Sequence, residues 1–195
     1  MISKVFIDAN VLYSRTLRDW MFLLRASSDL GFMTLATSED AIVEAQGSFR
    51  KNNPTAPGWQ IAKIRETTID SIDELVVDYT VLSDPITSDH LDNHIIAAAE
   101  AWNANYLITS DKGFETLSNV PELLDAFEFE VYKPDDFFML VADSAPELVR
   151  GVAVQQQKYW SSKRTSKSLV HALQEANCPQ FAQRIDRQFR DLSGA

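Results

Sequence analysis

The sequence has one cysteine and no long apolar run, and each scarcity removes a class of protein. Cys178 alone cannot form an internal disulfide or a thiolate metal cluster. The longest apolar runs are only a handful of residues, too short to span a bilayer. Residues 1–4 lead directly into a strand pattern and lack the features of a signal peptide. These absences favour a cytoplasmic protein without a membrane partner.

Basic side chains are also scarce over most of the 195 residues. Residues 1–150 carry 11 basic and 25 acidic side chains, a net charge of −14. Residues 151–195 carry seven basic and three acidic ones, a net charge of +4. The acidic body argues against passive binding to nucleic acid, while the basic tail suits either gripping a polyanion or docking on the body. Both readings of the tail stay open.

Apolar patterns alternate between strand and helix over the first two thirds of the chain. Strands are predicted at 4–8, 32–36, 78–82, 106–109 and 129–132, and helices at 16–30, from Thr37 or Ser38 onward, and at 62–76, 93–103 and 122–127. Glu39 and Asp40 provide the negative charge that is favoured in the first turn of a helix. Residues 51–58 contain two prolines and a glycine and predict a loop. The alternation predicts a three-layer α/β sandwich with a central parallel sheet.

The pattern is purely helical from Pro134 onward. Helices are predicted at 134–142, 145–160, 165–176 and 178–191, with a polar break at 159–167. No internal repeat is evident. The chain therefore divides into an α/β domain over 1–142 and a helical carboxy-terminal extension over 143–195.

Four acidic residues occur where this chain ends a strand or begins a helix: Asp8, Glu44, Asp92 and Asp111. In open parallel sheets, sites form at the carboxyl ends of the strands. Carboxylates gathered there repel each other unless a proton or a hard cation lies between them. The first interpretation is therefore a divalent-metal site.

Each of the four has a simpler reading when taken alone. Asp8 and Asp111 can be turn or capping residues, Glu44 can be a solvated residue of a helix surface, and Asp92 can cap the helix at 93–103, with Asp89 as an alternative cap. The occurrence of all four in this order is what favours a site.

The set resembles the PIN domain family of metal-dependent nucleases, which includes the VapC-type toxins of bacterial toxin–antitoxin pairs. The resemblance is carried by five segments: FIDAN at 6–10, SEDAIVE at 38–44, DNHIIAAA at 92–99, LITSDKGF at 107–114 and KPDDFF at 133–138. Each motif is weak alone, and the set covers most of the chain in the family's order. One PIN subfamily also carries a helical carboxy-terminal extension, which matches residues 143–195.

The resemblance implies a metal-dependent endoribonuclease that uses Mg²⁺ or Mn²⁺. Asp8, Glu44, Asp92 and Asp111 correspond to the metal-binding and catalytic acids, and Asn10 or Thr109 would orient them. Many relatives have an Asp-Phe pair where this chain has Gly113 and Phe114, so Asp89 becomes the stand-in for a fifth carboxylate. The histidines His90, His94 and His171 are interpreted as capping, core and surface residues respectively, with His90 also a minor candidate for a proton donor.

The resemblance also implies partners. The substrate would be RNA, a small antitoxin would cover the acidic pocket and insert an arginine against its carboxylates, and two copies of the chain would form a homodimer.

Two alternatives belong to other classes. The first is a PIN-like module that binds RNA or protein without cleaving it. The acidic body favours this alternative, because the contacts that hold the phosphates of a substrate need Lys or Arg, and the body has few of them. A haloacid-dehalogenase-like phosphotransferase also begins with an aspartate at a strand end. It needs a second acid two residues later, where this chain has Asn10.

Overall fold

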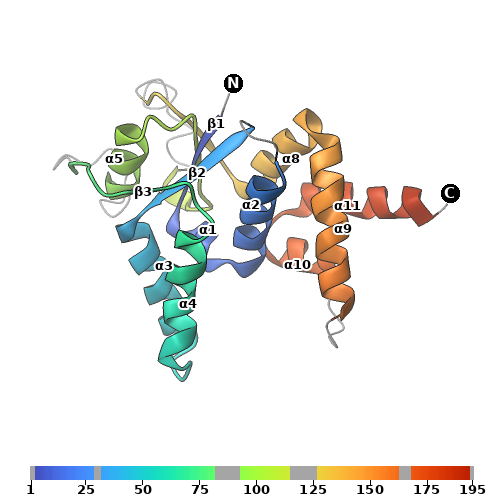
Figure 1. Cartoon of the computed structure of the whole chain (residues 1–195), viewed down its shortest axis with the longest axis horizontal. Helices are drawn as coiled ribbons and strands as arrows, with labels where there is room; N and C mark the ends of the chain where they lie inside the picture. Colours follow the sequence, from blue (N-terminus) through green and yellow to red (C-terminus); the bar gives the residue numbers. More distant parts are fainter. Residues whose placement is uncertain (1–2, 29–31, 82–92, 115–126, 163–167, 194–195) are drawn as a thin grey trace.

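Five strands form the centre of the computed structural model, which describes residues 3–28, 32–81, 93–114, 127–162 and 168–193 (Figure 1). The strands are β1 (Ser3–Ile7), β2 (Met33–Ser38), β3 (Glu74–Val76), β4 (Tyr106–Ile108) and β5 (Glu130–Tyr132). Their order is β3-β2-β1-β4-β5, and every neighbouring pair is parallel. The predicted α/β fold with a parallel sheet is therefore confirmed.

Helices cover both faces of this sheet. They are α1 (Ala9–Tyr13), α2 (Arg15–Ser27), α3 (Glu39–Asn52), α4 (Gly58–Ile69) and α5 (Asn93–Ala101). The chain moves outward from β1 to β3 and then returns across the sheet to β4 and β5. Because such crossovers are right-handed, the helices before β3 lie on one face and α5 lies on the other. The arrangement has the three layers that the sequence predicts.

The strand order reverses between β1 and β4, which lie side by side at the middle of the sheet. Val5, Phe6 and Ile7 of β1 are fully buried, as are Leu107 and Ile108 of β4. The chain leaves these two strands in opposite directions, so a crevice opens beyond their carboxyl ends. The fold therefore brings the residues after Ile7 and Ile108 together.

The predictions for 62–76 and 78–82 are wrong in position. Helix α4 ends at Ile69, and β3 occupies Glu74–Val76. The reason is Asp73, whose backbone N–H donates to the Leu35 carbonyl oxygen at 2.8 Å and whose carboxylate accepts from the Leu35 N–H. Arg25 of α2 also forms an ion pair with this carboxylate. Contacts with β2 thus override the local helical pattern.

Smaller differences occur at other element ends. The sequence prediction gives no range for the short helix α1. This helix follows directly from β1, and Asp8 caps its first turn. Asn103, with φ at 54°, ends the helical run earlier than predicted. Helix α9 continues through Ser162, so the polar break at 159–167 does not begin at Tyr159. The helix predicted at 122–127 lies almost entirely outside the described residues.

The last four helices are α8 (Pro134–Ser144), α9 (Pro146–Ser162), α10 (Leu169–Glu175) and α11 (Pro179–Ser193). They gather on one side of the sheet domain, next to α2 (Figure 1). Position 142, the expected domain boundary, falls within α8, and one apolar core includes buried residues from both sides of it.

Several contacts attach α11 to the rest of the molecule. The buried carboxylate of Asp135, in α8, accepts hydrogen bonds from the backbone N–H groups of Gln180 and Phe181 at 3.1 and 2.9 Å. The ring of Phe181 packs edge-on against Trp20 of α2, with centroids 4.8 Å apart, and lies 5.0 Å from the ring of Phe138. The segment at 133–138 therefore serves to dock the carboxy-terminal helices.

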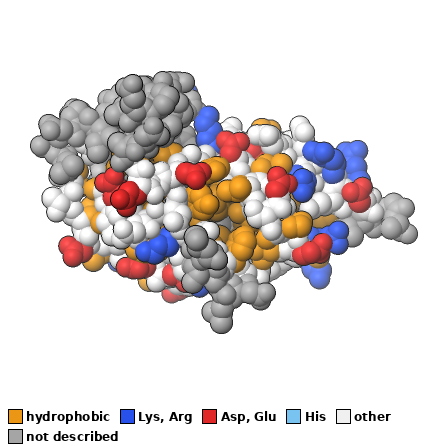
Figure 2. All heavy atoms as spheres, turned by 90° about the horizontal axis from the view of Figure 1, so that it is seen from above, with side chains coloured by type: hydrophobic (Ala, Val, Ile, Leu, Met, Phe, Trp, Pro, Cys, Tyr) orange, Lys and Arg blue, Asp and Glu red, His pale blue; other side chains and the backbone are white. Residues whose placement is uncertain are grey.

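None of the described helices is long and apolar enough to cross a membrane. On the face drawn in Figure 2, acidic and basic side chains surround a central apolar area, so this face does not carry a field of one sign.

Candidate functional site

The carboxyl ends of β1 and β4 position the first candidate residue. The backbone N–H of Asp8 donates to the Ile108 carbonyl oxygen at 3.1 Å, which continues the pairing of the two strands by one residue. Asp8 then caps α1, since its Oδ1 accepts the Ala9 N–H at 2.5 Å. The side chain is held at the strand-order reversal, where ligand sites form in open α/β sheets.

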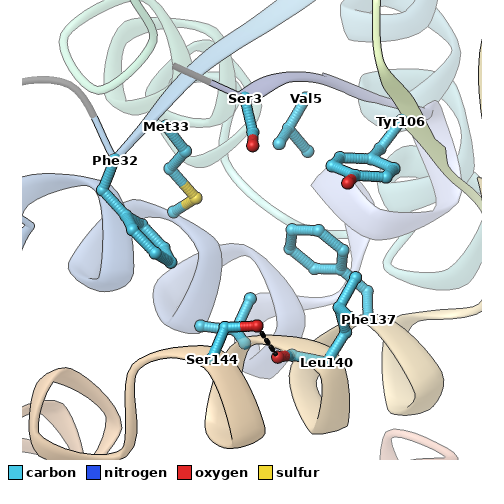
Figure 3. Close-up of a pocket in the computed structure, with 9 residues that line it drawn as sticks. Ser3, Val5, Phe32, Met33, Tyr106, Phe137, Leu140 and Ser144 are labelled. Carbon is cyan, nitrogen blue, oxygen red and sulfur yellow. Dashed lines mark hydrogen bonds between the residues drawn. The ribbon is translucent and has the colours of Figure 1, made fainter. Parts of the chain in front are cut away.

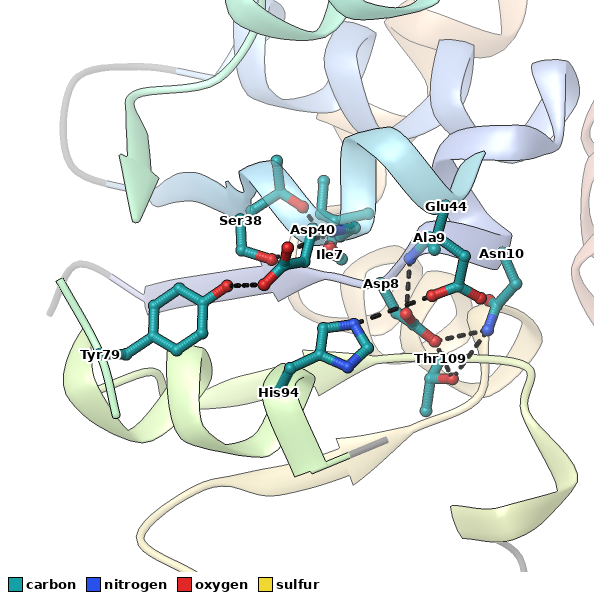
Figure 4. A network of polar contacts seen from close by, with 12 residues as sticks. Ile7, Asp8, Ala9, Asn10, Ser38, Asp40, Glu44, Tyr79, His94 and Thr109 are labelled. Atoms are coloured by element: carbon teal, nitrogen blue, oxygen red, sulfur yellow. Dashed lines mark hydrogen bonds and ion pairs between the residues drawn. The ribbon is translucent and has the colours of Figure 1, made fainter. Parts of the chain in front are cut away.

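Two neighbours orient the Asp8 carboxylate (Figure 4). The hydroxyl of Thr109 donates to Asp8 Oδ2 at 2.6 Å, and the side-chain amide of Asn10 donates to the same oxygen. The Asn10 amide also donates to Thr109 Oγ1 at 3.0 Å, and its Oδ1 accepts from both the N–H and the hydroxyl of Ser110 at 2.9 Å. Each polar atom of Asn10 therefore ties the end of β1 to the end of β4.

Burial and neighbouring acids make ionisation of Asp8 unfavourable. The residue is 5% exposed, and its pKa rises from 3.8 to about 6. Burial is the largest cause, the hydrogen bonds from Thr109 and Ala9 act in the opposite direction, and the charges of Glu44 and Asp111 raise the pKa further. The structure thus brings two of the other predicted acids, Glu44 and Asp111, within electrostatic range of Asp8.

Glu44 lies on α3, with a side chain that is 57% exposed. It extends toward the space between Asp8 and His94, and one of its carboxylate oxygens is 3.8 Å from His94 Nε2 (Figure 4). The prediction that His94 is a core residue is wrong, because its side chain is 21% exposed and faces this carboxylate. The packing of α5 against α3 and β2 causes this position.

Asp111 follows β4 by three residues and is exposed. Its backbone N–H donates to Thr109 Oγ1 at 3.0 Å, and its carboxylate accepts the Gly113 N–H at 2.6 Å. It therefore caps the helical turn that begins at Lys112 and places a negative charge near Asp8. Asp89, His90 and Asp92 lie outside the described residues.

The described part of the site matches a hard divalent cation in donor chemistry. Asp8, Glu44 and Asp111 offer carboxylate oxygens, and their mutual repulsion is what a cation would relieve. Within the described ranges, no three His, Cys, Asp or Glu side chains are close enough to hold a metal ion by themselves. The described donors are of the right kind, but they are not close enough to one another to form a ligand set.

Sequence reasoning missed two contributors to this region. Ser110 anchors Asn10, and nothing in the sequence distinguishes it from an ordinary turn residue. The Tyr79 hydroxyl donates to Asp40 Oδ2 at 2.5 Å and fixes the segment after β3 against α3 (Figure 4). Burial, followed by the hydrogen bond to Asp40, raises the pKa of Tyr79 to about 12.

A separate apolar hollow of about 180 Å³ lies at the opposite, amino ends of β1, β2 and β4 (Figure 3). Apolar side chains such as Val5, Met33 and Phe137 dominate its lining, and the hydroxyl of Ser144 already donates to the Leu140 carbonyl oxygen. It lacks the convergent polar groups that the carboxyl edge has, so the carboxyl edge is the better candidate.

Comparisons of this chain with family models, with curated proteins and with solved structures give no match, so the assignment of the site depends on its own geometry.

Proposed function

We propose that this protein is a metal-dependent endoribonuclease of the PIN-like type, acting in the cytoplasm as the toxin of a toxin–antitoxin pair. One observation carries the proposal: Asp8 is buried at the strand-order reversal and is repelled by Glu44 and Asp111. A carboxylate that is buried among like charges costs stability, and such residues concentrate at functional sites. The motif order of the sequence supports the nuclease reading of this site.

Asp8, Glu44, Asp92 and Asp111 are the residues proposed to hold Mg²⁺ or Mn²⁺. When bound, the cation supplies the positive charge that stabilises a phosphodiester during hydrolysis. The chain itself supplies the orientation. Asn10 and Thr109 hold one oxygen of Asp8 in place, and the Ala9 N–H holds the other. Asn10 further fixes the turn that carries Asp111 through its bonds to Ser110.

The deciding experiment is incubation of purified protein with total RNA and Mn²⁺ or Mg²⁺, with an EDTA-treated sample in parallel. Asp8→Asn is the matched control, because it removes the charge and keeps the size of the side chain. Metal-dependent cleavage by the wild type that Asp8→Asn lacks supports the proposal. Equal cleavage by both proteins indicates a contaminating nuclease and gives the proposal no support.

A binding module without cleavage is the second candidate. It is favoured by the absence of a complete metal-binding group among the described side chains. RNA binding without cleavage in any divalent metal, unchanged by Asp8→Asn, would replace the nuclease reading by this one. The site does not favour a phosphotransferase, because Asn10 occupies the position of its second acid and the Asn10 amide is hydrogen-bonded to Asp8 and Thr109.

The proposed partners are an antitoxin with an arginine directed at the acidic site and a second copy of the chain. Exposed valines support a protein contact near this site: Val43 precedes Glu44, and Val77 and Val81 flank Tyr79, which is bonded to α3. Light scattering on the purified protein tests the homodimer. A strict monomer at all concentrations would remove it from the proposal.

A further inference from the structure

A cleft lined by cations and aromatic rings lies between the start of α2 and the hairpin formed by α3 and α4. Its volume is about 530 Å³. The hairpin wall is held in place by a hydrogen bond from the Gln46 side chain to the Ile61 carbonyl oxygen and by an ion pair between Arg65 and Glu39 at 3.0 Å. Six of its lining residues are cationic or aromatic: Tyr13, Arg15, Arg18, Phe49, Trp59 and Lys63.

The cleft continues toward the carboxy-terminal helices. A second hollow of about 330 Å³ shares Arg15, Asp19 and Thr67 with the first and reaches Tyr159 of α9. Arg15 crosses this junction, since it donates to the Tyr159 hydroxyl at 2.6 Å and lies 5.8 Å from the centre of the tyrosine ring. Figure 1 shows α4 and α9 on either side of α2. The extension thus forms one wall of a continuous groove.

The charge of the first hollow is opposite to that of the body. Its lining contains three cations, Arg15, Arg18 and Lys63, and one carboxylate, Asp19. The Arg18 guanidinium donates to the Leu12 carbonyl oxygen, and within the described part of the chain its Nε has no hydrogen-bond partner. Burial lowers the pKa of Arg18, with Asp19 acting in the opposite direction. A partly buried cation without a bonded carboxylate favours an anionic ligand.

Aromatic side chains accompany these cations. Trp59 is 67% exposed at the start of α4, although exposure of such a large apolar ring is unfavourable. Tyr13 and Phe49 line the same hollow. Cations that contact a phosphate backbone together with rings on which bases stack are the combination used to bind single-stranded nucleic acid.

Two helices connect this groove with the Asp8 site. Tyr13 is the last residue of α1, and Asp8 caps the first turn of the same helix. Five residues of helix correspond to about 7 Å along the axis. Glu44 and Phe49 are separated by the same number of residues on α3. The groove therefore begins about one and a half helical turns from the acidic residues.

We propose that this groove binds a single-stranded RNA segment next to the cleavage point, with phosphates on Arg15, Arg18 and Lys63 and a base stacked on Trp59. The proposal rests on the proposed RNA substrate and assigns to the carboxy-terminal extension a part in holding it. An acidic peptide would use the same cations, but the exposed Trp59 and its aromatic neighbours favour RNA.

The test is fluorescence anisotropy of a labelled single-stranded RNA of about a dozen nucleotides, a length within the range for such sites, with EDTA present so that cleavage does not interfere. Trp59→Ala should weaken binding about tenfold, the effect of losing one stacked base. Lys63→Ala should weaken it less and reduce the salt dependence of log K by about 0.7, the value for one phosphate contact on a single strand. Arg150→Ala is the matched control, because Arg150 is exposed and does not line the groove.

Several outcomes would refute the proposal that this groove binds RNA. They are no RNA binding by the wild type, equal binding by the groove and control variants, or competition by poly-glutamate as strong as by RNA with no effect of Trp59→Ala. The last result would assign the groove to an acidic peptide. If the protein cleaves RNA but the substitutions do not change RNA binding, the proposed binding groove is refuted and the proposed nuclease activity is supported. If RNA binding depends on Trp59 but the protein cleaves no RNA, the groove is supported and the nuclease activity is refuted.

Discussion

Two buried aspartates, Asp8 and Asp135, have opposite environments. Asp8 is 5% exposed and Asp135 is 7% exposed, and both accept hydrogen bonds at the start of a helix. The Asp135 carboxylate receives two backbone N–H groups from the first turn of α11, where free N–H groups and the helix dipole favour a negative charge. Asp8 also faces the charges of Glu44 and Asp111, which oppose its ionisation. The comparison shows that Asp135 is built into the packing of α11, and it supports the proposal that Asp8 holds a ligand.

The largest expected effect is on the Asp8 side of this comparison. Asp8→Asn should lower metal-dependent RNA cleavage about a thousandfold, equivalent to about 4 kcal/mol of activation free energy, because a metal-holding charge is lost. Asp135→Asn should leave the activity per folded molecule unchanged. Cleavage rates normalised to the folded fraction measure both effects. A comparable loss in the two variants would remove the distinction between the aspartates.

The next effect is on stability. Asp135→Ala should lower the free energy of unfolding by about 3 kcal/mol, because two buried N–H groups of α11 lose their acceptor. Urea unfolding, followed by the fluorescence of Trp20 and the other tryptophans, gives this value. Asp136→Ala is the neighbouring control, since its exposed carboxylate accepts a hydrogen bond from the Gln180 side chain rather than from the α11 backbone. If the Asp136 variant is destabilised as much, the docking role of Asp135 is refuted.

A smaller effect tests the orientation of Asp8. Asn10→Ala should reduce RNA cleavage by about 10- to 100-fold, the range found when a group that orients a metal ligand is removed. The fold should persist, because the backbone bond between Asp8 and Ile108 remains. Asn52→Ala, on the surface of α3, is the matched control. An unchanged cleavage rate in Asn10→Ala would show that Thr109 and the Ala9 N–H are enough to orient the carboxylate.

The smallest effect concerns the ion pair between Arg25 and Asp73. The Arg25 hydrogen bond is the largest cause that lowers the pKa of Asp73 below its usual 3.8. The stabilisation it gives is therefore present above about pH 4 and is lost as the pH falls through the lower, folded-state pKa. Between pH 7 and about pH 2.5 the wild type should lose up to about 1 kcal/mol more unfolding free energy than Asp73→Asn, since exposed pairs contribute little. Equal losses in the two proteins would show that water screens the pair completely.

The sequence predicts the parts of the fold whose causes are local. Ser38 accepts the Ala41 N–H and begins α3, with Glu39 and Asp40 in the first turn as expected. The position of β3 could not be predicted, because Asp73 ends the preceding segment through partners on β2 and α2. His94 shows the same limit at the site. Its neighbour Glu44 is 50 positions away in the sequence, so only the packing of α5 on α3 reveals their proximity.

Hydrogen bonds from Thr109 and Ser110 to Asp8 and Asn10 connect residues that are distant in the sequence and are therefore synthesised at different times. Thr109 and Ser110 are 101 and 100 positions from the residues they contact, Asp8 and Asn10. Ribosomes add about 5–20 residues per second, so roughly 5–20 s pass between synthesis of the two halves of the network. During that interval the emerging chain carries Asp8, Ala9 and Asn10 without Thr109 and Ser110. The site therefore cannot be completed until most of the chain has been translated.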